Sequence, residues 1–270
     1  MSQSRSWAVV LGASSGTGAA IAAEVARSRG YDVFGVHRGR YAEGAAELEQ
    51  AISATGRTLV LRRGDAATPE GAESGADALL ETAGRRSVKL LVHSLASGSV
   101  GHLAVPLEQK LHPKQLAKTF DVMAHSFVYW TQALVERDLL APNARILGLT
   151  NPLSKSLLHN TGAITAAKAA LEIYVRQLAI ELGPFGHRVN LLEFGTVVTP
   201  AIRHVYTPEA MERLESAHRR MNPCGRLCTV QEVARLVSLL CSDDADWFNG
   251  ATIDFTGGMM LKLIDLVLND

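Results

Sequence analysis

A glycine-rich loop near the start of the chain constrains the fold more than any other feature of the sequence. Gly12, Gly16 and Gly18 follow a short apolar run, Trp7–Leu11, and precede an alanine-rich stretch of helical character. The first glycine permits a tight turn off a strand, the second lets the backbone approach a pyrophosphate, and the third allows close packing of a helix on the sheet. The N-terminus of that helix offers free N–H groups to phosphates. The spacing predicts a strand–loop–helix unit that binds a dinucleotide.

The rest of the chain alternates short apolar runs with longer helical patterns. The predicted strands are Trp7–Leu11, Asp32–His37, Thr58–Arg63, Val88–His93, Ala144–Thr150, Arg188–Glu193 and Ala251–Phe255. The predicted helices are Gly18–Ser28, Ala42–Thr55, Gly71–Thr82, Pro113–Arg137, Ala163–Leu182 and Val230–Cys241. Consecutive apolar residues are typical of strands covered on both faces. We therefore expect an α/β protein: a single-domain Rossmann fold over residues 1–270, with a doubly wound parallel sheet of about seven strands and helices on both faces.

Length and charge exclude several other classes. The 270 residues suffice for one large domain. The 27 basic and 27 acidic side chains cancel, so no nucleic-acid partner is expected. No apolar run reaches the ~20 residues of a membrane span, and the first apolar run is too short for a signal peptide, so a cytoplasmic protein without a membrane partner is expected. Cys224, Cys228 and Cys241 lack the spacing of a zinc site, and reduced thiols with no metal are expected.

The residues after the second predicted strand favour one nicotinamide dinucleotide. An NAD site usually has an acidic residue there, which binds the ribose hydroxyls. This chain has His37 and Arg38, with Arg40 close behind. A carboxylate would repel a 2′-phosphate, whereas an arginine pairs with it in a bidentate fashion. NADP(H) is therefore preferred and NAD(H) stays possible, since these arginines could also be solvated loop charges. Asp65, after the third strand, could accept a hydrogen bond from adenine.

The motif G-x-x-x-G-x-G resembles the signature of the short-chain dehydrogenases/reductases, and the resemblance extends from Trp7 to about Met260. The turn V-H-S-L-A-S at Val92–Ser97 is similar to that of enoyl-acyl-carrier-protein reductases. So are His125-Ser126-Phe127-Val128 and G-P-F-G-H-R-V-N at Gly183–Asn190. The glycine loop itself is closer to the wider superfamily, so the chain combines features of both groups.

The resemblance implies a catalytic lysine. Lys168 matches the lysine that binds the nicotinamide ribose and lowers the pKa of a neighbouring tyrosine, the proton donor to the substrate oxygen. That tyrosine lies four residues before the lysine in most members and seven before it in enoyl reductases, and these positions hold Ile164 and Thr161. At about 100° per residue both lie on the helix face of Lys168. Isoleucine cannot transfer a proton, and threonine is a much weaker acid than tyrosine.

Other side chains are candidates for the missing proton donor. Asn151 stands where enoyl reductases have a second tyrosine, and Thr150 precedes it. Both can donate hydrogen bonds. The expected catalytic residues are Lys168, Thr161, Asn151, Thr150, Ser94 and Tyr206, with His159 and His125 as further candidates and Tyr129 and Tyr174 expected to pack in helices.

The segment after the sixth strand resembles the P-G-x-x-x-T turn of the family, with Phe194 in place of proline. The resemblance implies that Val197 holds the nicotinamide carboxamide and that Thr199 reaches the carboxamide or a phosphate. The expected cofactor residues are Gly12, Ser14, Ser15, Gly16, Thr17, Gly18, His37, Arg38, Asp65, Ala66, Ser94, Leu95, Ala96, Lys168, Gly195, Val197 and Thr199.

Residues 199–228 interrupt the regular alternation of strands and helices. They are interpreted as a substrate lid within the domain, and a surface helix pair is the alternative. Apolar residues expected at the mouth of the site are Leu95, Leu153, Leu157, Leu158 and Ile202. They favour an apolar small molecule or an acyl thioester as substrate.

Three functional interpretations remain open. The first is an NADPH-dependent reductase of a conjugated or activated carbonyl, such as an acyl, polyketide-derived or aromatic metabolite, because an enolate needs hydrogen bonds but can be protonated later by solvent. The second is a non-redox isomerase, dehydratase or cyclase, and the third is a cofactor-binding protein without catalysis. The resemblance implies a homo-oligomer, tetramer or dimer, assembled through the predicted helices Pro113–Arg137 and Ala163–Leu182 and the final strand region. The apolar C-terminal tail is expected to be buried in this assembly.

Overall fold

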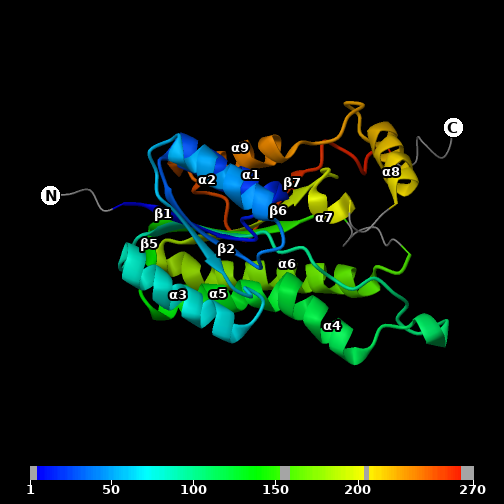
Figure 1. The fold of residues 1–270 in the computed structure, drawn as a ribbon, viewed down its shortest axis with the longest axis horizontal. Helices are drawn as coiled ribbons and strands as arrows, with labels where there is room; N and C mark the ends of the chain where they lie inside the picture. Colours follow the sequence, from blue (N-terminus) through cyan, green and yellow to red (C-terminus); the bar gives the residue numbers. More distant parts are fainter. Residues whose placement is uncertain (1–4, 153–158, 204–206, 263–270) are drawn as a thin grey trace.

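The computed structural model of the protein describes residues 5–152, 159–203 and 207–262. Seven parallel strands form one sheet in the order β3-β2-β1-β4-β5-β6-β7 (Figure 1). The strands are β1 Trp7–Leu11, β2 Asp32–His37, β3 Leu59–Arg63, β4 Val88–His93, β5 Leu140–Thr150, β6 Arg188–Phe194 and β7 Thr252–Phe255. The predicted doubly wound Rossmann fold is confirmed. The strand order reverses between β1 and β4, which is where such sheets bind their ligands.

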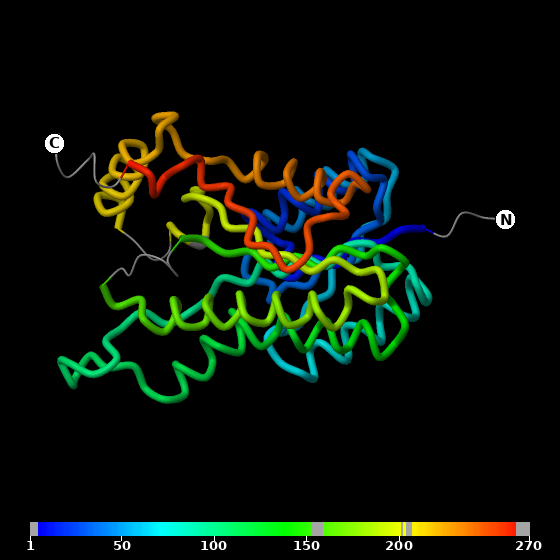
Figure 2. Tube along the Cα trace, turned by 180° about the vertical axis from the view of Figure 1, so that it is seen from behind, coloured from blue at the N-terminus to red at the C-terminus, as the bar shows by residue number. Residues whose placement is uncertain are grey.

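Helices cover both faces of this sheet (Figures 1 and 2). They are α1 Gly16–Arg29, α2 Ala42–Ser53, α3 Pro69–Ala83, α4 Pro113–Phe120, α5 Ser126–Glu136, α6 Gly162–Leu182, α7 Pro200–Arg203, α8 Pro208–Met221 and α9 Val230–Leu240. α1, α2 and α9 pack on one face, and α3, α5 and α6 pack on the other. Within the described ranges, no helix is both long and apolar enough to cross a membrane.

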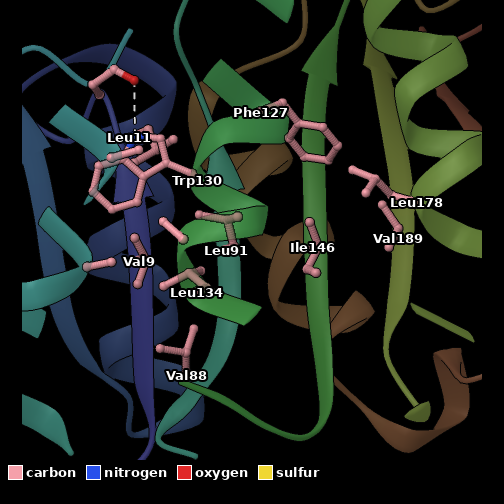
Figure 3. Packing of buried hydrophobic residues seen from close by; sticks show 14 of the residues in the cluster. Val9, Leu11, Val88, Leu91, Phe127, Trp130, Leu134, Ile146, Leu178 and Val189 are labelled. Carbon is pink, nitrogen blue, oxygen red and sulfur yellow. Dashed lines mark hydrogen bonds between the residues drawn. The ribbon is translucent and has the colours of Figure 1, made fainter. Parts of the chain in front are cut away.

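The core beneath α3, α5 and α6 holds the strand ends in place (Figure 3). Val9, Leu91 and Ile146 project from three neighbouring strands towards the aromatic rings of α5. Trp130 is fully buried there, and its indole Nε1 donates a hydrogen bond to the carbonyl oxygen of Ala66 at 3.0 Å. Burying each large apolar side chain contributes about 1.5–3 kcal/mol. This packing fixes the positions of the loops that follow the strands.

The predicted helical stretch Pro113–Arg137 is helical from Pro113 to Glu136, but its middle is not α-helical. A π-helical turn, Asp121–His125, separates α4 from α5. A π turn accommodates an extra residue without ending the helix, which leaves little trace in the hydrophobic pattern. Its consequence is local: the phenol Oη of Tyr174 on α6 lies 3.1 Å from Nδ1 of His125.

An irregular arm, residues 98–111, connects β4 towards α4 and projects from the body beside that helix (Figure 1). Its two sides are joined where the N–H of Leu111 donates to the carbonyl of His102 at 2.8 Å. The arm exposes a set of large apolar side chains, Val100, Leu103, Val105 and Leu107. Leu103 lies against the start of α6, because a Cβ on Gly162 would stand 2.8 Å from its methyl group.

Candidate functional site

The glycine loop joins β1 to α1 at the centre of the sheet. Gly12 has a φ of +87°, and a Cβ on Gly18 would stand 2.2 Å from the carbonyl oxygen of Gly12. No other residue fits either position without moving the backbone. Within the described part of the chain, the N-cap residue Ser15 makes no side-chain hydrogen bond to α1. The first N–H groups of α1 therefore remain available to an anion, as a bound pyrophosphate requires.

The loops after β4 and β6 close onto this glycine loop. The N–H of Ser94 donates to the carbonyl of Leu11 at 3.0 Å, and its Oγ would lie 3.3 Å from a Cβ on Gly18. Thr199 lies on the other side, where its Cβ would be 3.2 Å from a Cβ on Gly16. The remaining expected cofactor residues of these three loops are Ser14, Thr17, Leu95, Ala96, Gly195 and Val197. The structure thus gathers loops from three distant parts of the sequence at the carboxyl ends of the central strands.

A cluster of arginines lies at the ends of β2 and β3. His37 pairs in register with Arg63, and a Cβ on Gly39 would stand 3.0 Å from Nε of Arg63. Arg38 is half-buried, while Arg40 and Arg63 are exposed. Arg63 was not predicted as a site residue, because only the pairing of the two strands brings it beside the loop of Arg38. The Nδ1 atom of His37 is buried and has no hydrogen-bond partner among the described residues.

Asp65 lies two residues beyond β3 at the same end of the crevice. Its Oδ1 accepts a hydrogen bond from the N–H of Ala67 at 3.1 Å, while the side chain stays exposed. The neighbouring Ala66 is buried and turns its carbonyl towards Trp130. The backbone at this strand end is therefore held by two hydrogen bonds, and the Asp65 side chain stays exposed beside it.

Lys168 lies over the carboxyl ends of β5 and β6. Leu171, one turn further along α6, contacts Gly148, where a Cβ would stand 3.5 Å from its methyl groups. α6 runs antiparallel to the strands. The step of three residues from Leu171 back to Lys168, about 4.5 Å along the helix, therefore corresponds to a step along β5 from Gly148 towards Thr150. Thr150 pairs in register with Glu193. Lys168 is 7% exposed and Glu193 is 1% exposed.

Burial and charge change the acid–base properties of these groups. Burial lowers the pKa of Lys168 to about 8, and the negative charge of Glu193 acts in the opposite direction. Burial also lowers the pKa of His93 on β4 to about 4; nearby backbone groups oppose this shift, and the positive charge of Lys168 reinforces it. Glu193 was not among the predicted site residues, since its place at the end of an apolar strand gives no signal in the sequence.

His93 has a defined tautomer. Its Nε2 lies 2.8 Å from Oγ of Ser126, and that hydroxyl donates to the carbonyl of Val122 at 3.0 Å. Because the hydroxyl has one proton, the imidazole must donate through Nε2, which leaves Nδ1 as an acceptor. Nδ1 is buried without a hydrogen-bond partner among the described residues. A neutral, buried histidine therefore ends β4.

The two positions expected for a tyrosine lie on the first turn of α6. The Ile164 side chain lies against Gly98, where a Cβ would be 2.7 Å away from it. Thr161 is the buried N-cap residue of α6. Thr165, one turn further on, is buried as well, and its Oγ1 has no hydrogen-bond partner among the described residues. Thr165 is a further hydroxyl group that the sequence pattern did not single out.

The other candidate proton donors lie in several places. Asn151 follows β5, and its carbonyl accepts a long contact of 3.5 Å from Oγ1 of Thr150. His159 is exposed and contacts the ring of His102 edge-on, with centroids 5.2 Å apart. His125 and Tyr174 are hydrogen-bonded to each other. Tyr206 and the predicted mouth residues Leu153, Leu157 and Leu158 lie outside the described residues.

Helix α8, within the predicted lid, stands at one end of the molecule (Figure 2). Nδ1 of His218 on α8 lies 2.7 Å from Oγ1 of Thr196, and burial lowers the pKa of His218. At the end of α8, Asn222 donates to the carbonyl of Thr256 at 3.3 Å. Side chains therefore attach α8 both to the loop after β6 and to the turn after β7.

Comparisons with known proteins agree with this arrangement. The chain matches the family model described as enoyl-(acyl carrier protein) reductase over residues 12–260. It is 26% identical over 257 residues to a 1-cyclohexenylcarbonyl-CoA reductase of Streptomyces collinus, a match that covers 95% of this chain and 88% of the relative. It is 27% identical to a chloroplastic NADPH-dependent aldehyde reductase-like protein of Arabidopsis thaliana, with 93% of each chain covered.

Comparison with solved structures shows that the fold is shared with short-chain dehydrogenases/reductases. A short-chain dehydrogenase of Burkholderia cenocepacia in complex with NADP superposes with a TM-score of 0.81 at 25% identity, covering 96% of this chain and 98% of that one. L-sorbose reductase of Gluconobacter frateurii, complexed with NADPH and L-sorbose, superposes with a TM-score of 0.82 at 23% identity, covering 95% and 97%.

The sheet order, the glycine loop and the lysine of α6 define a short-chain dehydrogenase/reductase. Within this class the chain belongs to the enoyl-(acyl carrier protein) reductase family, and it is an NAD(P)H-dependent oxidoreductase.

Proposed function

We propose that the protein is an NADPH-dependent reductase of a conjugated or otherwise activated carbonyl compound. The observation that carries this proposal is the presence of a buried Lys168 on a helix face where Ile164 and Thr161 replace the expected phenol. Conjugate reduction leaves an enolate, which hydrogen bonds stabilise and solvent can protonate. Reduction of a simple ketone instead requires prompt protonation of an alkoxide. The resemblance to a 1-cyclohexenylcarbonyl-CoA reductase supports the same chemistry.

The preference for NADPH rests on the arginine cluster. Arg63 ends β3 with its side chain beside Gly39, and Arg38 and Arg40 follow β2, near the place where the adenosine ribose of a bound dinucleotide would lie. A guanidinium pairs with a 2′-phosphate through two hydrogen bonds, and a 2′-hydroxyl offers no such partner. The solved relative from Burkholderia cenocepacia, which is in complex with NADP, is consistent with this preference.

The remaining residues have distinct roles in this proposal. The bound dihydronicotinamide would supply hydride. The first turn of α1 would hold the pyrophosphate, Asp65 the adenine, Lys168 the nicotinamide ribose, and the loop of Val197 and Thr199 the carboxamide. The groups that would donate hydrogen bonds to the substrate oxygen are Thr150, Asn151, Thr161 and Ser94, with Tyr206 as a further candidate.

The substrate is proposed to be apolar, such as an acyl thioester or an aromatic enone. The apolar side chains of the arm and the contact between Leu103 and Gly162 support an apolar surface beside the start of α6. Residues 199–228 are proposed to form the lid on the opposite side of the crevice. The attachment of His218 to Thr196 would link that lid to the cofactor loop.

The test is a fluorescence titration with NADPH and NADH, followed by addition of an enoyl thioester or a cyclic enone while the nicotinamide absorbance is recorded. We expect tighter binding of NADPH and its oxidation by at least one acceptor. Lys168→Ala should abolish this oxidation. Binding without oxidation on a broad panel of acceptors would contradict the reductase, and product formed without net oxidation would indicate a non-redox enzyme.

We further propose that the protein is a homo-oligomer. Ile173 and Ile180 lie on one face of α6, two turns apart, and are 57% and 71% exposed. Large aliphatic side chains that are exposed on the same face of a helix are typical of an interface. A second copy packed on this face of α6 would bury both.

A further inference from the structure

We propose that the arm, residues 98–111, forms together with helix α4 a docking surface for a lipid bilayer that contains anionic lipids. The inference goes beyond the proposed reductase function and does not depend on it, because it concerns where the protein lies and not what it reduces. It departs from the expectation of a protein without a membrane partner, which rested on the neutral charge of the chain as a whole.

The apolar side chains of the arm are both concentrated and exposed. Twelve large apolar side chains are exposed among the described residues, and four of them fall within eight residues of the arm. These four, Val100, Leu103, Val105 and Leu107, are between 51% and 71% exposed. Contiguous apolar patches on a protein surface mark sites that contact another protein or a membrane.

Hydrogen bonds and one buried side chain hold the arm in this shape. The N–H of Gly101 donates to the carbonyl of Asn160 at 2.9 Å, and the N–H of Leu111 donates to the carbonyl of His102 at 2.8 Å. The Leu111 side chain is buried against Gly101, where a Cβ would stand 2.7 Å from its methyl group. The backbone of the arm is thus ordered by contacts that leave the four aliphatic side chains at the surface.

Lysines gather beside these apolar side chains. The chain has seven lysines, and three of them, Lys110, Lys114 and Lys118, lie within nine residues. All three are exposed, and the last two are one turn apart on α4. A bridge pairs Lys110 with His102 across the arm. Glu108 is the single acidic residue between positions 98 and 120, so this surface is positive although the whole chain is neutral.

The composition of this surface suits lipid better than a protein partner. Protein interfaces are enriched in tyrosine, tryptophan and arginine and depleted in lysine, and leucine and valine seldom dominate their affinity. Residues 98–118 contain no tyrosine, tryptophan or arginine. On a lipid surface, aliphatic side chains enter the boundary of the acyl chains while lysines stay at the headgroups. Each lysine near an anionic leaflet strengthens binding about fivefold.

The position of the arm relates this surface to the candidate site. The arm and α8 lie at the same end of the long axis of the molecule (Figures 1 and 2). The arm follows β4 and α8 comes after β6, so both extend from the edge at which the parallel strands end. The loops expected to bind the cofactor lie at this edge as well. A bilayer held by the arm would therefore face the side from which an apolar substrate is expected to enter.

The first test measures binding of the full-length protein to vesicles by co-sedimentation. Vesicles of phosphatidylcholine are compared with vesicles that also contain phosphatidylglycerol, at low and at high salt. We expect the wild type to bind the anionic vesicles at least ~10-fold more tightly than the neutral ones and to lose this preference at high salt. Absence of binding to the anionic vesicles would overturn the proposal.

A double variant tests the contribution of charge. Lys114→Glu, Lys118→Glu should weaken binding to anionic vesicles about 25-fold or more, because two positive charges leave the surface and two negative charges replace them. The matched control, Arg57→Glu, Arg235→Glu, changes the net charge equally at exposed positions outside this surface. Equal losses in both double variants would overturn the role of α4.

A second double variant tests the apolar contribution. Val105→Ser, Leu107→Ser should weaken vesicle binding about 10-fold or more, whereas Phe185→Ser, Leu239→Ser, which removes exposed apolar side chains outside the arm, should not. Lipids with brominated acyl chains should quench the fluorescence of Leu107→Trp more than that of the wild type, whose exposed Trp247 lies outside the arm. Equal quenching of the two proteins would overturn the insertion of the arm.

Other occupants of this surface would give different results. If a second copy covers the arm, light scattering would find a lower molar mass for Val105→Ser, Leu107→Ser than for the wild type, and vesicles would not be bound. If an acidic protein docks there, a polyglutamate peptide would bind in a lysine-dependent way, again without vesicle binding. Either result would overturn the lipid surface. The vesicle assays need no turnover, so their failure is distinguishable from a failure of the reductase assay.

Discussion

Oγ1 of Thr196 and Nδ1 of His218 lie 2.7 Å apart, so one side-chain hydrogen bond joins the loop after β6 to helix α8. Thr196 directly precedes Val197, which is proposed to hold the nicotinamide carboxamide. A movement of α8 would therefore displace the cofactor loop, and a bound cofactor would in turn favour one position of α8.

Loss of this hydrogen bond should loosen the proposed lid. His218→Ala is expected to increase tryptic cleavage within residues 199–228 several-fold, because α8 loses its side-chain hydrogen bond to the loop after β6. NADPH should protect the wild type more than the variant. Limited proteolysis with and without NADPH measures both effects, and Glu212→Gln, a change of an exposed residue on the same helix, is the control. Equal cleavage rates in all three proteins would contradict the lid.

The arginine cluster makes a prediction about cofactor choice. Arg38→Ala or Arg63→Ala should weaken NADPH binding about 10- to 100-fold, since a charge-assisted hydrogen bond to the 2′-phosphate contributes about 1.5–3 kcal/mol. The affinity for NADH should barely change. Arg57→Ala is a matched control, because this exposed arginine lies against Gly30 at the other end of the strands. Fluorescence titration measures both affinities. Equal losses of affinity for NADPH and NADH would contradict the assignment of these arginines to the 2′-phosphate.

The exposed face of α6 makes a prediction about assembly. The double variant Ile173→Glu, Ile180→Glu should have a lower molar mass than the wild type, because like charges brought together across an interface oppose association. Light scattering at micromolar concentration measures this, and circular dichroism checks the fold. A wild type that is already monomeric at this concentration would contradict the proposed oligomer.

His93 should make the protein sensitive to acid. The folded imidazole stays neutral down to a pKa of about 4, whereas in the unfolded chain it binds a proton near its ordinary value of 6.5. Acidification from pH 6.5 to 4 therefore favours the unfolded state by up to about 1.4 kcal/mol per pH unit. His93→Gln should show a flatter dependence of Tm on pH in this window, whatever its Tm at pH 7. Parallel curves of Tm against pH for the wild type and His93→Gln would contradict the conclusion that His93 is buried in its neutral form.

Glu232 at the start of α9 should stabilise the fold at neutral pH and should lose this effect in strong acid. Hydrogen bonds from Arg226 and from the backbone of Thr229 lower the pKa of this carboxyl to about 2. The stabilisation is complete above the unfolded pKa of 4.5 and is lost as the pH falls through 2. Glu232→Gln should lower Tm by about 2 °C at pH 7. Differential scanning fluorimetry should find a smaller difference at pH 3, and an equal difference at both values would count against the charge effect.

Much of the fold could be predicted from the sequence because its signals are local. The strands are continuous apolar runs, and the glycine spacing marks the turn after β1. The predicted bounds of β1, β2 and β4 agree with the structure, whereas β5 begins at Leu140, four residues before the predicted Ala144. Pro142 and Asn143, which has a positive φ, interrupt the apolar run inside this strand, so only the part after them was predicted as a strand.

The parts of the site that could not be predicted depend on pairing between distant segments. Arg63 reaches the loop of Arg38 only through the register of β2 with β3. In the sequence, Glu193 is only a polar residue at the end of an apolar strand. Its position near Lys168 follows from the pairing of β6 with β5 and from the packing of α6 above them. The π-helical turn is hidden for a different reason: it continues the helical pattern on either side and changes only the direction of the side chains.

The arginines at the ends of β2 and β3 have a consequence for how a nucleotide would reach the protein. The chain as a whole is neutral, so these guanidinium groups form a local positive field at one end of the crevice. Such a field steers an anion before contact, and its reach shrinks as salt is added. NADPH would arrive with its 2′-phosphate leading, and the nicotinamide would swing in afterwards beneath α8. The association rate would then fall with ionic strength, while the rate of the later movement would not.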